Sequence, residues 1–421
     1  MLGCLHRPRS QYTLERQTKG HIHMHIPGRA RAASSLLAIL AVVPLSACAQ
    51  STAAEQMTPL LLAVHDAPVP FHGSEGRTHL VYELAMTNFS SGDISIQKVE
   101  ILGDGAVLQT LDGTALAARL QPAGIRDSAG TLPKSAHALL FLNVILAPGA
   151  AVPRELSHRV AILASAAPPG HQNMSETGGP VSVDRQPVVQ IGPPLRGAGY
   201  ISADSCCDAT RHTRAAMPID GRVWIAQRFA VDWEQLNASG TIYSGPQQKL
   251  ESYAIFGQPA IAVADAIVAS VVDGQPEQTP GKYPTNIPLA DADGNCVILD
   301  LKDDLGDHRY ALYAHLQPGS VKVHRGEHVA LGQVLGLVGD SGNSVVPHLH
   351  FQVTTRPSSM ASNGLPYEIR DFQITGKVPG TEVFDKSETD GSQLPVASIM
   401  PPENVKSALP LDQYIFAFPS H

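Results

Sequence analysis

The chain has 421 residues, of which 43% are hydrophobic and 16% are charged, and a globular composition over this length predicts two domains with tails. The formal net charge of -8, with no basic stripe that could neutralise phosphates, excludes a nucleic-acid partner. The 33 prolines and 36 glycines, with only 5% aromatic residues, favour short strands and frequent turns over long helices. We therefore predict an all-β chain.

Residues 1–48 have the pattern of an export signal. Arg29 and Arg31 precede the apolar run Ala32–Val43, which is too short to span a bilayer but typical of a signal-peptide core. The tetrapeptide that ends at Cys48 follows directly and resembles the bacterial lipobox, in which the cysteine is acylated. We predict an exported lipoprotein of the cell envelope, anchored to a membrane through Cys48, on the periplasmic side in a two-membrane cell. Met24 is an alternative start that would give a signal of conventional length.

A short polar tether, residues 49–58, is expected to lead into a first domain at residues 59–191. Alternating apolar segments in this domain are separated by turns rich in Gly, Asp and Ser: 60–64, 79–88, 94–102, 138–146 and 158–163. This spacing predicts an antiparallel β-sandwich. The segment holds no cluster of catalytic residue types, so we expect a binding or spacer module.

A second domain is predicted at residues 192–375. Its apolar runs predict strands of an antiparallel sheet: 223–233, 258–273, 295–300, 310–316 and 347–353. The polar segment 234–251 is expected to form a loop near the mouth of a site. Residues 376–421 are punctuated by proline and are expected to form a C-terminal tail.

Three cysteines fall in the second domain. Cys206 and Cys207 are adjacent, and adjacent cysteines seldom bridge to each other comfortably, so we expect either of them to pair with Cys296 in an oxidising envelope. The sequence does not decide which of the two is the partner.

The stretch from Pro347 to Val353 carries two histidines on one strand. Because side chains alternate between the faces of a strand, His348 and His350 project to one side, while Leu349 faces the opposite layer. A catalytic zinc site usually has three protein ligands and a water. The pair could therefore supply one zinc ligand and one group for proton transfer.

Several motifs precede this strand in a defined order. They are Tyr313-Ala314-His315-Leu316, then Gly332-Gln333, then the glycine-rich run from Gly336 to Gly342. The order resembles that of the lysostaphin or LytM-type zinc metallopeptidases, which cut peptidoglycan cross-links, and the resemblance spans roughly residues 226–353. It implies a C-terminal antiparallel β-sheet metallopeptidase domain with zinc (Zn2+) as cofactor.

The resemblance also implies roles for individual residues. Asp232 and His350 would bind zinc, His348 would take a proton from the attacking water, and His315 would stabilise the developing oxyanion or assist proton transfer. The sequence departs from the family at Arg228, which stands where the family has its first histidine ligand. A guanidinium stays protonated and has no lone pair to give, so Arg228 cannot bind zinc.

His212 is the candidate replacement ligand. Asp220-Gly221 predicts a hairpin that would bring the segment of His212 beside that of Arg228. A two-residue turn sets His212 opposite Phe229, whereas a three-residue turn sets it opposite Arg228, on the same face as Asp232. The three-residue turn would deliver the missing imidazole from the neighbouring strand.

The sequence thus predicts a zinc-dependent metalloendopeptidase that hydrolyses peptide bonds in peptidoglycan, in the stem peptide or the cross-bridge. The alternative is a catalytically inactive LytM-like regulator with a cell-wall hydrolase as its partner, or a wall-binding lipoprotein. The substitution at Arg228 favours the alternative, and the retention of Asp232, His315, His348 and His350 favours the enzyme.

Overall fold

The computed structural model describes residues 57–124, 130–208, 211–301 and 308–420. Cys48, the signal sequence and most of the tether lie outside these residues. Strands account for 46% of the structure and helices for 6%, which confirms the all-β prediction. None of the helices that the structure describes is long and apolar enough to cross a membrane.

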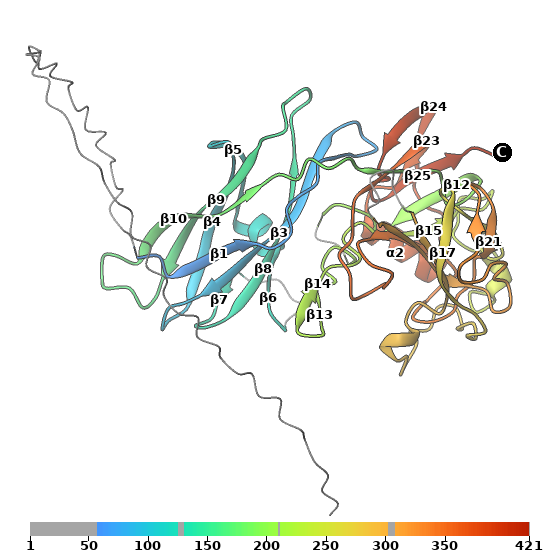
Figure 1. Cartoon of the computed structure of the whole chain (residues 1–421), viewed down its shortest axis with the longest axis horizontal. Coiled ribbons are helices and arrows are strands. Elements are labelled where there is room, and N and C mark those ends of the chain that lie inside the picture. Colours follow the sequence, from blue (N-terminus) through green and yellow to red (C-terminus); the bar gives the residue numbers. More distant parts are fainter. Residues whose placement is uncertain (1–56, 125–129, 209–210, 302–307, 421) are drawn as a thin grey trace, which may run out of the picture. The chain divides into compact units, whose positions relative to one another are not determined.

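The N-terminal half folds into two antiparallel sheets (Figure 1). The first has the order β1-β3-β8-β6 with β2 beside β3: β1 (Leu60–Val64), β2 (Phe71–His72), β3 (Thr78–Asn88), β6 (Leu120–Pro122) and β8 (His137–Ile145). The second has the order β10-β9-β4-β5 with β7 beside β4: β4 (Ile94–Gly103), β5 (Ala106–Asp112), β7 (Thr131–Leu132), β9 (Glu155–Ala164) and β10 (Asn173–Ser182). A short helix, α1 (Gly113–Ala117), follows β5.

One apolar cluster fills the space between these two sheets. Leu80 and Leu84 from β3 and Val99 and Val160 from the other sheet are all fully buried within it. These side chains occupy alternate strand positions, which is why a period of two in the sequence produces a sandwich. The predicted β-sandwich is confirmed.

A buried histidine in this core makes the stability of the sandwich depend on pH. The Tyr82 hydroxyl lies 2.9 Å from Nε2 of His158. Burial lowers the pKa of His158 from the ordinary value of 6.5 to about 4. Between these two pH values the imidazole is protonated in the unfolded chain and neutral in the folded chain. The free energy of unfolding is therefore highest above pH 6.5 and decreases as the pH falls towards about 4.

We expect this one group to cost up to about 3 kcal/mol of unfolding free energy over that interval. Urea unfolding of the wild type and of His158→Gln, at neutral pH and near pH 4, measures it. The decrease in unfolding free energy between the two pH values should be smaller in His158→Gln than in the wild type. His171→Gln, at an exposed position of the same half, serves as control, and an equal fall in wild type and His158→Gln would contradict the prediction.

The C-terminal half is built on an 11-stranded sheet. Its order is β11-β23-β25-β12-β15-β22-β19-β18-β17-β20, with β24 beside β23. The bounds are β11 (Val189–Ile191), β12 (Gly197–Ala203), β15 (Val231–Gln235), β17 (Ala266–Val272), β18 (Asn295–Asp300), β19 (Tyr310–Leu316), β20 (His328–Val329), β22 (Leu349–Thr354), β23 (Tyr367–Lys377), β24 (Ala397–Ala408) and β25 (Tyr414–Phe418). All pairs are antiparallel except β11 with β23.

Smaller elements complete this half. Two further two-stranded antiparallel sheets are the hairpin of β13 (Met217–Ile219) with β14 (Arg222–Trp224) and the pair of β16 (Pro259–Ile261) with β21 (Val334–Leu337). Two single turns of 3-10 helix are Leu250–Ser252 and Leu289–Asp291. Helix α2 (Thr381–Asp390) and strands β24 and β25 occupy the segment expected as a tail, and β25 lies inside the sheet between β12 and β23.

The cysteines differ from expectation. Cys206 and Cys207 form a disulfide with each other, and Cys296 is a buried free thiol. The physical reason is location, because Cys296 packs on β18 in an apolar cluster separate from the one that holds the other two. Burial raises the pKa of the Cys296 thiol to about 12, so this cysteine is held in its unreactive protonated form.

Candidate metal centre

Three adjacent strands of the large sheet position the candidate site. In β22 the side chains of Leu349 and Phe351 are fully buried in the core, so alternation turns His350 to the opposite face. His350 is in register with Asp232 on β15 and with Ala314 on β19. His315 follows Ala314 as the last residue but one of β19.

The backbone of His315 adopts an uncommon conformation. Its φ is 62°, in the left-handed region that non-glycine residues rarely occupy. Its amide donates to the Asp293 carbonyl at 2.9 Å, and its carbonyl accepts from Gly339 at 2.9 Å. The surrounding loops thus hold His315 in a costly conformation, as is common for residues of functional sites.

Three side chains converge with the geometry of metal ligands. The ligand atoms of His212, Asp232 and His350 all lie within 4.8 Å of one another. Nε2 of His212 lies 3.4 Å from Oδ2 of Asp232, and Nδ1 of His350 lies 2.8 Å from Oδ1 of the same carboxylate. The imidazoles of His212 and His350 meet edge to face, with centroids 4.9 Å apart.

Backbone carbonyls fix the tautomers of three imidazoles. Nδ1 donates to the Asp204 carbonyl at 2.9 Å in His212, to that of Ser341 at 2.7 Å in His315, and to that of Val346 at 2.8 Å in His348. A ring nitrogen that donates to a carbonyl must carry the hydrogen, so in the neutral ring Nε2 keeps the lone pair. Each of these rings therefore presents an Nε2 lone pair.

His350 is oriented the other way. Its Nε2 donates to Oε1 of Gln352 at 3.0 Å, and the Gln352 amide donates to the Ser359 carbonyl at 3.0 Å, which fixes its orientation. Nδ1 faces Asp232. Burial alone would lower the pKa of His350, but the hydrogen bond and the charge of Asp232 outweigh it and raise the pKa. The proton shared by Nδ1 of His350 and Oδ1 of Asp232 thus lies where a metal cation could bind to both groups.

The remaining groups have pKa values suited to metal binding. Burial alone would raise the pKa of the Asp232 carboxyl, but the imidazoles of His212, His348 and His350 hold it well below its ordinary value. Burial lowers the pKa of His212 against the attraction of Asp232. Burial, reinforced by His348 and His350, lowers the pKa of His315 well below its ordinary value. At neutral pH His212 and His315 are neutral, the form that binds a metal or accepts a proton.

His212 reaches the site by a route other than the predicted hairpin. The turn has two residues, with Ile219 paired with Arg222, and the hairpin ends at the pair of Met217 with Trp224. Of the two turns that the sequence allows, the two-residue turn forms, so the hairpin does not set His212 opposite Arg228. His212 instead lies in the turn segment that links β12 to β13, where its carbonyl accepts from Ala215 at 3.0 Å.

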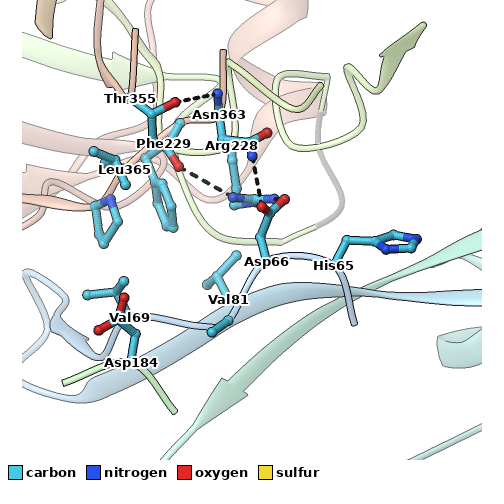
Figure 2. A pocket seen from close by; sticks show the side chains of 13 residues that line it. His65, Asp66, Val69, Val81, Asp184, Arg228, Phe229, Thr355, Asn363 and Leu365 are labelled. Carbon is cyan, nitrogen blue, oxygen red and sulfur yellow. Dashed lines mark hydrogen bonds and ion pairs between the residues drawn. The ribbon is translucent and has the colours of Figure 1, made fainter. Parts of the chain in front are cut away.

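Arg228 points away from the site. The strand expected over residues 223–233 is broken after Trp224 and resumes at Val231, so Arg228 lies in the turn between β14 and β15. Its Nε and Nη2 donate to the two carboxylate oxygens of Glu83 at 2.8 and 2.6 Å. Figure 2 shows the same guanidinium directed towards Asp66, 3.6 Å away. Arg228 is thus a buried partner of the sandwich and does not occupy the place of a metal ligand.

The four histidines and Asp232 line one cleft, with a volume of about 610 Å³. The sequence analysis missed three further residues of its wall: Glu234, Phe384 and Glu388. Glu234 was detectable, because it follows Asp232 by two positions on a strand and must share its face. No sequence signal marked Phe384 and Glu388, which come from helix α2 in the segment expected as a tail.

Part of the candidate site lies in a segment that matches a known protein family. Residues 251–363 match the sequence profile of Peptidase family M23, which identifies this segment as an M23 peptidase domain. The matched range contains three of the cleft histidines and begins after Asp232. His212 and Asp232 therefore join the domain from the part of the chain that precedes the match.

Parts of the chain are similar to individual known proteins. A 71-residue stretch is 39% identical to lysostaphin from Staphylococcus staphylolyticus and from Staphylococcus simulans, covering 16% of this chain and 14% of each relative. A mutant catalytic domain of the prophage-encoded M23 protein EnpA from Enterococcus faecalis is 18% identical, with a TM-score of 0.23, over 40% of this chain and 90% of that one. A zinc containing peptidase from Vibrio cholerae is 14% identical, with a TM-score of 0.21, over 72% and 83%. The chain thus spans 14% of the length of the lysostaphins.

Proposed function

We propose that this protein is a zinc-dependent metalloendopeptidase that hydrolyses peptide bonds of peptidoglycan, in the stem peptide or the cross-bridge. The observation that carries the proposal is the convergence of His212, Asp232 and His350 beside His315 and His348 in one cleft. The M23 domain and the likeness to lysostaphin support the reaction and the substrate class. The roles of these five residues are part of this proposal.

The three ligand groups fit zinc. Imidazole nitrogen and carboxylate oxygen are ligands that zinc prefers, and three of them leave one position for water or substrate. The donor atoms would be Nε2 of His212, a carboxylate oxygen of Asp232 and Nδ1 of His350. Outside the triad, Oδ1 of Asp232 also has Nε2 of His348 3.5 Å away. Zinc held there supplies Lewis acidity, which lowers the pKa of a coordinated water from ~15.7 toward ~7.

The two remaining histidines handle protons. His348 accepts a proton from the attacking water at Nε2, because its Nδ1 already donates to Val346. His315, whose ring lies 4.7 Å from that of His348, faces the same space with its own Nε2. Nε2 of His315 receives that proton from His348 and then donates to the carbonyl oxygen that gains charge or passes the proton to the leaving amine. The Ser341 carbonyl that holds its Nδ1 prevents the ring from flipping.

We also propose that the protein is exported and anchored in the cell envelope by a lipid on Cys48. An anchored chain would meet peptidoglycan outside the cytoplasm, on the periplasmic side in a two-membrane cell. A single acyl chain gives marginal membrane binding, so stable anchoring would need the additional acyl chains that bacterial lipoproteins carry.

Zinc content tests the proposed function. We expect about one zinc per chain in the full-length protein, and loss of most of it in His212→Ala and in His350→Ala, because each removes one of three ligands. Elemental analysis after metal supplementation measures it. His324→Ala, at an exposed histidine 84% accessible at its side chain, should keep its zinc.

Peptidoglycan digestion is the companion assay. Release of soluble peptides by the wild type, and not by the two ligand variants, is expected. A wild-type protein that takes up no zinc would overturn the proposal. That result would favour an inactive LytM-like regulator with a cell-wall hydrolase partner, or a wall-binding lipoprotein.

A further inference from the structure

Two carboxyl side chains lie together in the cleft, next to the metal ligands. Glu234 follows Asp232 by two residues on β15, so both project from the same face of the sheet. Glu388 reaches the same place from α2, and a hydrogen bond joins the two carboxyls, one of which must carry the proton. Neither residue has a part in the proposed hydrolysis.

The pair has unused hydrogen-bonding capacity. Glu234 is only 3% exposed, it lines the cleft, and its Oε2 has no hydrogen-bond partner among the described residues. Buried polar atoms are normally satisfied, so the unpaired Glu234 oxygen in the cleft wall indicates a group that binds there.

The cations of the cleft are engaged elsewhere. Arg211 is within electrostatic reach of Glu388, but its Nε is bound by Asp204 at 2.8 Å and its Nη2 by Asp385 at 3.1 Å. Arg214 donates to Oε1 of Gln121 at 3.0 Å. No lysine is among the described residues that line the cleft. The carboxyl pair therefore lacks a dedicated positive partner.

Building on the proposed function, we propose that Glu234 and Glu388 bind the side-chain ammonium of a diamino acid in the peptide substrate. An ammonium has three N–H donors and can take the place of the proton that the two carboxyls share, which passes to solvent. Phe384 and Val346, which line the same cleft, offer apolar surface to the aliphatic stem that carries the ammonium. Glu388 is within electrostatic reach of His348, so the recognised residue adjoins the bond that is cut.

Binding of a matched pair of small probes tests this proposal without relying on catalysis. The probes are Nα-acetyl-lysine methylamide and its Nε-acetylated form, titrated into the full-length, zinc-loaded protein and followed by ligand-observed NMR. We expect the free amine to bind at least about tenfold more tightly, because a hydrogen-bonded charge is lost in the acetylated form. Glu234→Gln and Glu388→Gln should each abolish the preference.

Glu382→Gln provides the matched control, because Glu382 is exposed on the same helix and does not line the cleft. It should keep the preference in full. Thermal unfolding of each variant shows whether the fold is intact, and Glu388→Gln, at a half-buried helical position, keeps the test decisive if Glu234→Gln does not fold.

Equal affinity for the two probes, including no measurable binding of either, would overturn the proposal, as would a preference that survives both substitutions. A second zinc per chain that is lost in Glu234→Gln would also overturn it, since the pair would then be a metal site. These outcomes are separate from the proposed function, because the protein could digest peptidoglycan and show no preference for the amine, or bind the amine and cut nothing.

Discussion

Replacing His348 with alanine is expected to lower kcat on a peptidoglycan peptide by roughly 10²- to 10⁴-fold, which is the usual contribution of a general base. Zinc content should stay at the wild-type level, because His348 is not among the three converging ligands. KM should change little, since the imidazole acts on the attacking water. Steady-state kinetics together with elemental analysis measures all three quantities.

His328→Ala is the matched control, because His328 is exposed on the short strand β20 and lies outside the cleft. Its kcat should equal that of the wild type. A His348→Ala enzyme with unchanged kcat would remove His348 from the mechanism and leave His315 as the proton acceptor. Loss of zinc in the same variant would instead make His348 a ligand.

Replacing Arg228 with alanine is expected to reduce the free energy of unfolding by about 3–5 kcal/mol, the usual effect of removing one partner of a buried ion pair. Arg228 and Glu83 are 5% and 7% exposed. Nε of Arg228 donates to Oε1 of Glu83, and Nη2 donates to Oε2. Burial alone would lower the pKa of Arg228, but Glu83 and Asp66 outweigh it, so the charge is fixed. The variant would leave the Glu83 carboxylate buried without its main partner.

Denaturant unfolding at neutral pH measures this change. Arg370→Ala, at an exposed position whose guanidinium donates to the Gln190 carbonyl at 3.3 Å, should leave stability nearly unchanged. The double variant Arg228→Met/Glu83→Leu should recover most of the loss, because well-packed apolar groups often replace a buried ion pair without penalty. A single variant as stable as the wild type would show that the pair has no net structural role.

The sequence predicts the strand-borne part of the site well, for a simple geometric reason. Period-two alternation and the motif order indicate His315, His348, His350 and Asp232, and the structure brings these four together. Strand register is set by the core face, so residues on the opposite face can be located from the pattern of apolar residues alone.

Prediction fails where a residue is positioned by irregular or distant segments. His212 lies beside Asp232 and His350, but a turn and not a strand carries it, and no periodicity describes a turn. Arg228 is read as an occupant of the site, whereas its partner Glu83 lies 145 positions earlier in the chain. Glu388 belongs to a helix whose segment shows only polar and proline-rich composition. Such long-range pairings depend on tertiary packing that one sequence does not display.

Strand β25 has a consequence for how the protein is made. It follows every other strand in chain order, yet it pairs with β12 and β23 in the interior of the large sheet, and β12 in turn pairs with the strand that carries Asp232. Synthesis must therefore pass residue 418 before this sheet can close. Pairings between such distant segments form slowly because the loop entropy must be overcome first. Until β25 is made, the edge of β12 that faces away from β15 has no partner strand.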